Sequence, residues 1–588
     1  MRQLAQLAIS LAVLASLSAC GAVEEIAPDL AADATGVEII VAGTSPLPPT
    51  EPPSPPTAGP AAFLDTQQKS VQFLTMAGLG GPLSEAQALV GTDAALWVQS
   101  QMAMPPTGYE AQISLAIPRA DAKNRDNAQL LWQTMFNTDA ELRTRMTYAL
   151  SQITVIGDRS FFNDGYGLAA WYDTLDHNAF GNYRDLLEDV TYSPMMGRYL
   201  TYLFNQKGNP ATGRQPDENY AREVMQLFTI GLVELNMDGT PKLQPDRQPF
   251  ETYNNDDVVG LARVFTGFVL QGTSHRNADR AINSNEVPMV LYEPWHSELE
   301  KSFLGTTIPA NTPAAQSVDQ ALDTLFAHPN LAPFISRQLI QRFTASHPSP
   351  DYVERVATAF ETGSFTSDSG VSFGTAQRGD LAATLAAILL DESLYDGGQN
   401  PSEGKVREPV LKFAQFARTY AKAGTTNVMT GEFNQFRDTS DPNDRLGQAP
   451  LKSPSVFNFY RPGFIAPNTE TGKMDLTAPE LQIVNQASNI GYLDFIFRYL
   501  TRIEGGNHNG LIVPDLTEEL TVSLDPAALR DLIDLKLTGG RMSPTTRANM
   551  LAMLEAYEIR PDRLQEDAYI RVILAVMMAV SSPAFATL

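Results

Sequence analysis

Cysteine is almost absent from this chain of 588 residues, and its scarcity excludes several kinds of site. The only cysteine is Cys20, so no disulfide can form within the chain and none can stabilise its fold. Metal sites built from several cysteine thiolates are excluded for the same reason. Because no other thiol is present, we also do not expect catalysis by a cysteine nucleophile.

Positive charge is scarce as well. The chain has 42 lysines and arginines against 67 aspartates and glutamates, which gives a formal net charge of −25. A protein that binds nucleic acid needs a basic surface to neutralise phosphates, so the composition argues against a nucleic-acid partner. The acidic excess needs no special partner either, since net charge by itself keeps a protein soluble.

The N-terminus has the pattern of a signal peptide. Arg2 precedes an apolar run over residues 7–17 that is too short to span a bilayer. The run ends in Leu17-Ser18-Ala19-Cys20, which resembles a bacterial lipoprotein cleavage box. The resemblance implies that residues 1–19 are removed and that Cys20 becomes a lipidated N-terminus, whereas an ordinary signal peptide ending in cysteine is the alternative. By the same resemblance, Gly21 in place of an aspartate favours the outer over the inner membrane of the cell envelope.

Residues 20–62 have the composition of a tether. Half of residues 45–60 are proline, which favours an extended polyproline conformation of about 3 Å per residue. Such a spacer holds the folded body on the order of 50 Å from a membrane.

Helical periodicity dominates the rest of the chain. Leu142, Met146, Ala149, Leu150 and Ile153 illustrate it, because they lie at spacings of three and four and form one apolar stripe. The connections between such segments are short, which is typical of helices packed against each other. We therefore predict an all-α fold, a large helical body over residues 63–588.

One segment, residues 270–310, breaks this rhythm. Within it, residues 289–292 and 301–304 have the pattern of short strands, and we expect no β-structure elsewhere. We interpret the segment as a small irregular insertion. The body is then either undivided or made of two packed subdomains, about residues 63–269 and 311–588.

The most informative helical stretch is residues 217–235. At helical spacing, Tyr220, Val224, Leu227, Phe228 and either Gly231 or Leu232 form an apolar stripe. Asn219, Arg222, Glu223 and Gln226 gather on the opposite flank. A charge buried in such a helix is costly unless it is paired. The flank therefore belongs either to a structural polar network or to a functional site.

A second helix is predicted to face this flank. Asn255 or Asp256 has the character of its N-cap, and the apolar side of residues 257–268 faces inward. Asn219, Arg222 and Glu223, together with Asp256, Asp257 and Arg263, have the chemistry of a carboxylate acid–base pair or an anion clamp. A salt-bridge network between the two helices is the alternative.

His296 is the most suggestive single residue. It lies among Glu293, Glu298 and Glu300 within the irregular insertion. An imidazole among carboxylates has the chemistry of a general base or of a ligand to a hard divalent metal ion. A structural histidine is the alternative.

Four further residues have simpler interpretations. His328 precedes a proline and is predicted to end a helix, and Asp380 is predicted to be an N-cap. Lys405 and Arg407 precede a helix, where they either contact an anion or are solvated. Two common motifs, a zinc-binding H-E-x-x-H helix and a dinucleotide-binding G-x-G-x-x-G turn, are missing from the sequence.

Several segments together resemble one bacterial family, which is named "domain of unknown function 1800". The resemblance extends in the expected order over most of residues 65–588. It implies a large, often exported protein, and it supplies no established activity or catalytic residues. The segments that carry it are residues 142–152, 179–184, 216–232, 328–330, 378–381 and 453–459.

Two functions fit these observations. The first is an envelope-anchored enzyme, a hydrolase acting on an extracytoplasmic polymer or its fragments. Its candidate residues are Glu223, Arg222, His296, Asp257 and Arg263, with a divalent metal ion as a conceivable cofactor. The second is a non-catalytic scaffold or accessory lipoprotein that works with another exported envelope protein.

Overall fold

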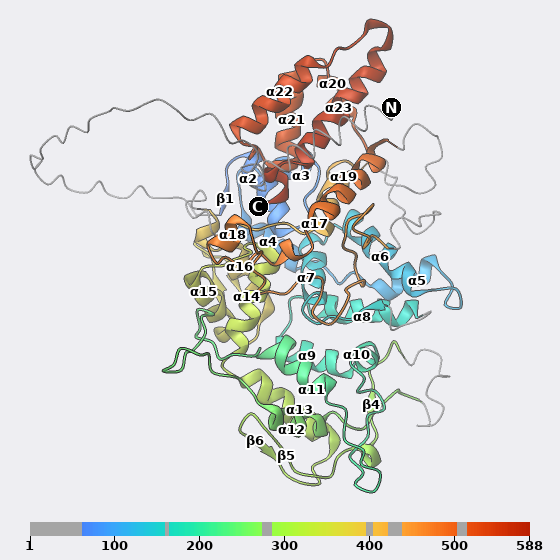
Figure 1. The fold of residues 1–588 in the computed structure, drawn as a ribbon, viewed down its shortest axis with the longest axis vertical. Helices are drawn as coiled ribbons and strands as arrows, with labels where there is room; N and C mark the ends of the chain where they lie inside the picture. The colour runs from blue at the N-terminus through green and yellow to red at the C-terminus, as the bar shows by residue number, and fades with distance from the viewer. Residues whose placement is uncertain (1–61, 159–163, 273–284, 396–403, 422–437, 502–513) are drawn as a thin grey trace, which may run out of the picture.

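The computed structural model describes residues 62–158, 164–272, 285–395, 404–421, 438–501 and 514–588 (Figure 1). Helices dominate this part of the chain, and its strands form only two-stranded sheets. The predicted all-α class is therefore confirmed. No helix within the described ranges is both long and apolar enough to cross a bilayer. The predicted signal peptide and nearly all of the predicted tether, residues 1–61, lie outside these ranges.

The first part of the body consists of helices that connect through short turns. In α7, every residue from Glu141 to Leu150 is buried, including Arg143 and Arg145. The helices are α2 (Gln67–Ala77), α3 (Leu83–Leu89), α4 (Ala94–Met102), α5 (Tyr109–Ala116), α6 (Asn124–Asn137), α7 (Glu141–Ser151), α8 (Gly165–His177), α9 (Tyr183–Tyr192) and α10 (Pro194–Tyr199).

The middle of the chain contains a π-helix and the predicted insertion. Its helices are α11 (Asn219–Glu223), the π-helix η2 (Val224–Thr229), α12 (Asn255–Val264), η4 (Glu293–Trp295), α13 (Ala314–Ala327), α14 (Leu331–Phe343), α15 (Pro350–Thr362), α16 (Leu381–Leu389) and η5 (Glu392–Leu394). The last third is again helical. It contains α17 (Pro409–Thr419), α18 (Glu470–Lys473), η7 (Pro479–Gln482), α19 (Gln486–Thr501), α20 (Thr517–Val522), α21 (Pro526–Thr538), α22 (Pro544–Ala556), η9 (Pro561–Arg563), α23 (Leu564–Val580) and α24 (Pro583–Ala586).

Short antiparallel strand pairs close turns of the chain. β3 (Phe268–Val269) pairs with β4 (Val290–Leu291), and β5 (Lys301–Phe303) pairs with β6 (Thr306–Ile308), so the strands predicted near residues 289–292 and 301–304 are confirmed. The prediction that β-structure is confined to this insertion is wrong. β1 (Phe63–Leu64) pairs with β2 (Thr92–Asp93), and β7 (Phe365–Thr366) pairs with β8 (Ser372–Phe373). A two-residue strand is too short to show alternation in a sequence.

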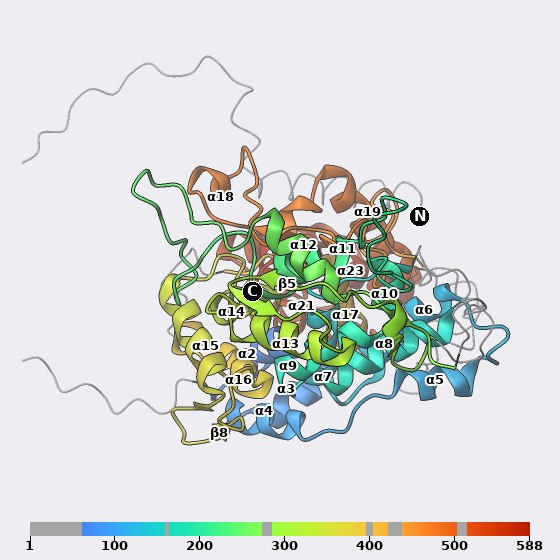
Figure 2. The same cartoon turned by 90° about the horizontal axis from the view of Figure 1, so that it is seen from below.

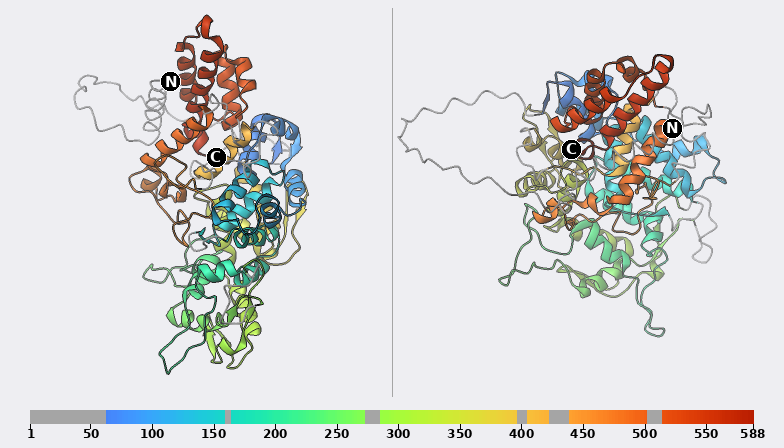
Figure 3. Two further views of the ribbon diagram at one scale, coloured as in Figure 1. Left: turned by 90° about the vertical axis from the view of Figure 1, so that its right-hand side faces the viewer. Right: turned by 45° about the horizontal axis from the view of Figure 1, so that its top comes forward.

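The molecule is elongated, with different helices at its two ends. α20 to α23 lie at one end, and α11 to α13 with the β5–β6 hairpin lie at the other (Figures 1 and 3). Seen from below, α12, α13 and β5 lie in front of the remaining body (Figure 2). α7, α14 and α17 occupy the middle. This arrangement places the central helices between the two ends, away from most solvent.

Two large hydrophobic clusters form the core. The larger cluster joins residues on both sides of the 270–310 insertion, for example Leu261 before it and Leu322 and Ile335 after it. The second cluster joins Trp132 on α6 to α17, α19 and the C-terminal helices. Helices that are distant in the sequence therefore share each core.

α17 is buried along its whole length, although it carries charged side chains. The Arg418 guanidinium pairs with Glu141 at 2.8 Å and donates to the carbonyl of Gly80 at 2.6 Å. The Lys412 ammonium lies over the ring of Tyr492, 4.4 Å from its centroid. Burial, together with the nearby charge of Arg407, lowers the pKa of Lys412 to about 7. The folded chain therefore releases this proton at a pH where an unfolded chain still holds it.

We expect Lys412→Met to raise the melting temperature most at and below neutral pH. The unfolded chain keeps the Lys412 proton up to its ordinary pKa of about 10.5, so the cost of burying the lysine falls as pH rises between the two values. The stabilising effect of the substitution, about 1.4 kcal/mol for each unit between the two pKa values, should therefore shrink between about pH 7 and pH 10. Thermal unfolding at a series of pH values measures this trend.

Lys473→Met provides the matched control. The Lys473 side chain is 68 % exposed and pairs with Glu470 at the surface, so its removal should change the melting temperature little at any pH. A stabilising effect of Lys412→Met that stays constant or grows with pH would contradict the explanation.

Candidate functional site

The helix predicted over residues 217–235 is shorter in the structure and has two parts. α11 continues directly into the π-helix η2, in which an N–H bonds to the carbonyl five residues earlier rather than four. The Ile230 N–H donates to the Met225 carbonyl at 2.9 Å. Gly231 follows with a φ of +71°, a left-handed conformation that ends the helix. The prediction of a helix is therefore wrong beyond Thr229.

The apolar stripe of this stretch is buried where the stretch is helical. Tyr220, Val224 and Phe228 are fully buried, and the Tyr220 ring stacks on that of Tyr202 with centroids 4.1 Å apart. Leu232, beyond the end of the helix, is 55 % exposed. The stripe therefore positions η2 against the core.

Glu223 is the most unusual residue on the polar flank. It is 8 % exposed, and its Oε2 atom has no hydrogen-bond partner among the described residues. Burial raises the pKa of Glu223, whereas the charge of Arg222 lowers it. Arg222 itself is half-exposed and pairs with Glu218 at 3.4 Å, and the Asn219 backbone N–H donates to Asp217 at 2.8 Å.

The charged residues of α12 contact parts of the chain other than Glu223. The N-cap is Asn254, one residue before the predicted caps, and Asp257 completes the capping box by accepting the Asn254 N–H at 2.8 Å. Asp257 also accepts the Leu304 N–H at 2.7 Å, and Arg263 donates to the Glu300 carbonyl at 2.8 Å. Both residues therefore hold the β5–β6 hairpin. Within the described part of the chain, no hydrogen bond or ion pair joins them to Glu223.

Asp256 makes a simpler contact on the same helix. Its backbone N–H donates to the Asn254 side chain at 2.7 Å, within the first turn of α12. It thus belongs to the helix start together with Asp257. The six residues proposed from the sequence do not converge on one point.

His296 is buried, and each of its ring nitrogens has a partner. Nδ1 lies 2.9 Å from the Thr266 carbonyl oxygen, and Nε2 lies 3.2 Å from the Ser317 hydroxyl. Burial lowers the pKa of His296, which favours the neutral imidazole. This geometry matches the structural alternative, in which the histidine links the chain just after α12 to α13.

The carboxylates near His296 in the sequence point to separate partners. Glu293 accepts the Ala314 N–H at the start of α13, and Glu298 pairs with Lys207 at 2.6 Å. No group of three or more histidine, aspartate or glutamate side chains in the described ranges is arranged to hold a metal ion.

Four other residues from the sequence analysis have structural partners. Asp380 caps α16 by accepting the Ala383 N–H, and His328 is the C-cap of α13, both as predicted. Lys405 and Arg407 are buried rather than solvated. Lys405 pairs with Glu480 at 2.7 Å, and Arg407 donates to the Phe585 carbonyl at 3.1 Å.

A pocket of about 320 Å³ lies beside η2. Its walls come from the end of α7, from η2 and the residues after it, from α14, and from an irregular segment over residues 456–463. On α14, Phe334, Gln338 and Arg342 follow at spacings of four and so share one face of the helix. The complete lining is Gln152, Ile153, Gln226, Leu227, Gly231, Leu232, Phe334, Gln338, Arg342, Val456, Phe457, Tyr460, Arg461, Pro462 and Gly463.

One protein family matches most of the chain. The family model described as "Protein of unknown function (DUF1800)" matches residues 72–587. The chain belongs to this family. No curated protein and no solved structure matches the chain significantly. Of the segments by which the sequence resembles the DUF1800 family, residues 142–152, 216–232 and 453–459 each contribute to the lining of the pocket.

Charged residues are buried directly behind the pocket of this DUF1800 protein. We call Arg145, Arg342, Lys405, Glu408 and Glu480 the buried charge cluster, because each is at most 1 % exposed. The Arg145 guanidinium donates to the Arg342 carbonyl at 2.6 Å, and Lys405 pairs with Glu480 at 2.7 Å. Burial lowers the pKa values of Arg145 and Lys405, and the charge of Glu408 opposes this shift at both. α7, α14 and α17 meet at these contacts.

Glu408 is the main acceptor of this region. Its Oε2 atom accepts hydrogen bonds from the Gln152 side chain at 2.7 Å and from the Tyr460 hydroxyl at 2.8 Å, and also from Gln448. Tyr460 and Gln152 line the pocket as well. The pocket is therefore connected to the buried charge cluster through two polar side chains.

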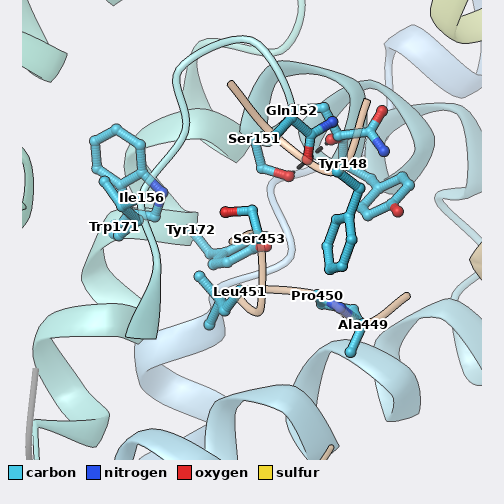
Figure 4. A pocket seen from close by; sticks show the side chains of 12 residues that line it. Tyr148, Ser151, Gln152, Ile156, Trp171, Tyr172, Ala449, Pro450, Leu451 and Ser453 are labelled. Carbon is cyan, nitrogen blue, oxygen red and sulfur yellow. Dashed lines mark hydrogen bonds between the residues drawn. The ribbon is translucent and has the colours of Figure 1, made fainter. Parts of the chain in front are cut away.

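A second cavity, of about 20 Å³, lies on the other side of Gln152. α7 supplies Tyr148 and Ser151 to it, its C-cap supplies Gln152, and residues 449–453 face them (Figure 4). A space of this size holds about one water molecule, so it is too small for an organic ligand.

Sequence reasoning missed Arg342, Gln338 and Glu408. A signal for the first two was present, because an arginine and a glutamine at a spacing of four lie among Leu339, Ile340 and Phe343 in an apolar helix. Glu408 precedes Pro409 and gave no signal beyond that of a helix start.

One further motif in the sequence has a structural explanation. Residues 370–374 have the G-x-S-x-G spacing of a nucleophile elbow. Ser372 lies on β8, and its hydroxyl is 3.1 Å from that of Thr366 in the β7–β8 hairpin. Because an elbow requires a strand, a sharp turn and a helix, this spacing is coincidental.

We expect Gly231→Ala to lower the melting temperature more than Gly213→Ala does. Both glycines have a φ near +70°, so either substitution strains the backbone by about 1–2 kcal/mol. A methyl group at Gly231 would also lie 2.6 Å from the Phe334 ring, whereas nothing lies within 4 Å of the same position at Gly213. The steric conflict should add about 1–3 kcal/mol. Thermal unfolding of the two variants measures the difference, and equal effects would contradict a close contact between the helix end and Phe334.

Proposed function

We propose that this protein is an envelope-anchored lipoprotein whose pocket beside η2 binds one fragment of an extracytoplasmic polymer for hydrolysis. The observation that carries the proposal is the pocket itself, with its mostly apolar walls and a few polar groups that connect to buried charges. Binding sites for small molecules have this character. Convergence of three family segments on the same pocket supports the choice of this site.

The size of the pocket favours a fragment over a long chain. A volume of about 320 Å³ is at the lower end of the volumes of ligand sites, which begin at about 300 Å³. It therefore accepts a single building block or the end of a polymer.

Glu223 is the candidate general acid, although its side chain is not part of the pocket lining. A carboxyl whose pKa is raised by burial holds its proton closer to neutral pH, as protonation of a leaving group requires. Glu223 lies on the helical turn before Gln226 and Leu227, which line the pocket. In this proposal, Gln152, Gln226 and Tyr460 orient the ligand by hydrogen bonds, while apolar residues such as Phe334 exclude water.

A non-catalytic scaffold is the second candidate function. It is favoured by the segment after η2, where Leu232, Leu243 and Phe250 are 55 %, 55 % and 41 % exposed. The bridges between Val233 and Glu251 and between Leu243 and Pro249 bring these segments together, and contiguous exposed apolar surface is typical of sites that bind another protein. The partner would be another exported envelope protein.

The anchor is tested with Cys20→Ser in the full-length chain. The wild-type protein should sediment with cell membranes and partition into detergent, and its N-terminal peptide should carry lipid in a mass spectrum. Cys20→Ser should abolish the lipid and release the protein into the soluble fraction. Unmodified Cys20 in the wild-type protein would contradict the proposal.

The catalytic proposal is tested by incubating the purified protein with isolated cell-wall polymer and measuring released fragments. Glu223→Gln should lower the release by at least about a hundredfold without a loss of thermal stability, because it removes the proton donor. Glu298→Gln, at an exposed residue paired with Lys207, is the matched control and should leave release unchanged. If the wild-type protein releases nothing and repeatedly captures the same exported protein, the scaffold is the better explanation.

The role of the pocket is tested separately with Gly463→Trp. Gly463 lines the pocket, and nothing lies within 4 Å of the position where a side chain would begin. The indole should therefore occupy the pocket and abolish fragment release, whereas Gly463→Ala should retain it. Full activity of Gly463→Trp would place the reaction elsewhere.

A further inference from the structure

The pocket is positively charged on a chain that is strongly acidic. Acidic residues outnumber basic ones 67 to 42 in the whole sequence. The pocket lining nevertheless includes two arginines, Arg342 and Arg461, and neither aspartate nor glutamate. A site with this local charge attracts anions and repels cations.

Arg342 is built into the pocket rather than placed at its rim. The residue is 1 % exposed, and its guanidinium lies 5.0 Å from the centroid of the Tyr460 ring. Its Nη2 atom makes one long hydrogen bond, 3.4 Å, to the Gln152 carbonyl. Its Nε and Nη1 atoms have no hydrogen-bond partner among the described residues. Two strong donors are thus held in an apolar setting without an acceptor.

Gln338 adds a third donor on the same face of α14. It lies one helical turn before Arg342, is 6 % exposed, and its Nε2 atom also has no partner within the described ranges. A buried donor without a partner costs about 1–3 kcal/mol, and more when it is charged. An oxyanion in the pocket would accept hydrogen bonds from both side chains.

The buried charge cluster does not neutralise Arg342. Glu480 is engaged by Lys405. Oε2 of Glu408 accepts hydrogen bonds from neutral side chains, and its Oε1 atom has no hydrogen-bond partner among the described residues. Neither Arg342 nor Arg145 forms an ion pair within 4.0 Å with a carboxylate in the described part of the chain. The cluster has three cations and two carboxylates, so one positive charge remains in excess beside the pocket.

We infer that the ligand of this pocket carries an oxyanion, a carboxylate or a phosphate, which Arg342 and Gln338 bind together. The inference rests on the proposed function, since it names the chemical class of the fragment. A guanidinium donates strong charge-assisted hydrogen bonds to such groups, and the unpartnered Nε and Nη1 atoms of Arg342 are two separate donors on different edges of the group. The remainder of the ligand is apolar and packs against Phe334, Leu232 and Phe457.

The charge requirement is tested with two fluorescent probes that differ by one anionic group. Anilinonaphthalene sulfonate carries an oxyanion, and phenylnaphthylamine is its uncharged counterpart. The wild-type protein should bind the sulfonate at least about tenfold more tightly, as expected for a charge-assisted hydrogen bond. Competition by phenyl phosphate and by phenylpropionate then distinguishes a phosphate site from a carboxylate site.

Two substitutions locate the preference. Arg342→Met should abolish the advantage of the sulfonate and leave binding of the uncharged probe unchanged. Gln338→Glu is the second variant, because it places a carboxylate one turn before Arg342 and pairs with it internally. It should therefore raise the melting temperature while it weakens sulfonate binding. Arg563→Met is the matched control at an exposed arginine outside the pocket, which pairs with Glu566, and it should leave sulfonate binding unchanged.

The outcomes separate this inference from the proposed function. Equal binding of the two probes, or a sulfonate preference that survives both Arg342→Met and Gln338→Glu, would overturn the oxyanion assignment. If Gly463→Trp still blocks both probes in that case, the pocket remains a binding site for a neutral ligand. If Gly463→Trp blocks neither probe, the pocket is not the binding site, and both proposals fail.

Discussion

Burial of charge at the junction of α7, α14 and α17 is the constraint on which the rest of the molecule depends. Arg145, Arg342 and Glu408 come from segments that lie 66 to 263 residues apart in the sequence, and each is at most 1 % exposed. An isolated buried charge costs several kcal/mol, so each of these helices requires the other two. The hydrophobic clusters on either side are joined at this point. A part of the chain that contained only one of the three helices would bury its charge without compensation.

Much of the fold could be predicted because its signal is local. Helical spacing of apolar residues is visible within a dozen residues, and it identified the helical body. A break in this spacing identified the segment that holds the strands near residues 289–292 and 301–304. The end of the helix at Gly231 was harder to predict from the sequence. A π-turn and an α-turn place apolar residues at nearly the same spacing over six residues, so the sequence does not distinguish them. The two-residue strands outside the insertion show no pattern for a similar reason.

The site was harder to predict because its contacts are not local. His296 is surrounded by carboxylates in the sequence, but Thr266 and Ser317, which take its two nitrogens, lie 30 and 21 residues away. Glu408 accepts from Gln152, which is 256 residues distant. No pattern along the chain reports such pairings. Arg342 is the exception, because a cation among the apolar residues in the last turn of α14 indicates a buried polar contact even when the partner cannot be named.

The π-helix has a consequence for how the pocket tolerates change. In η2, the wider turn shifts the residues after it by about one position relative to an α-helix, which rotates them by roughly 100° about the axis. Removing one residue between Val224 and Thr229 would restore the narrower turn. Gln226 and Leu227 would then face a different direction, although the helix would stay helical. The shape of the pocket therefore depends on the length of this segment as much as on its composition.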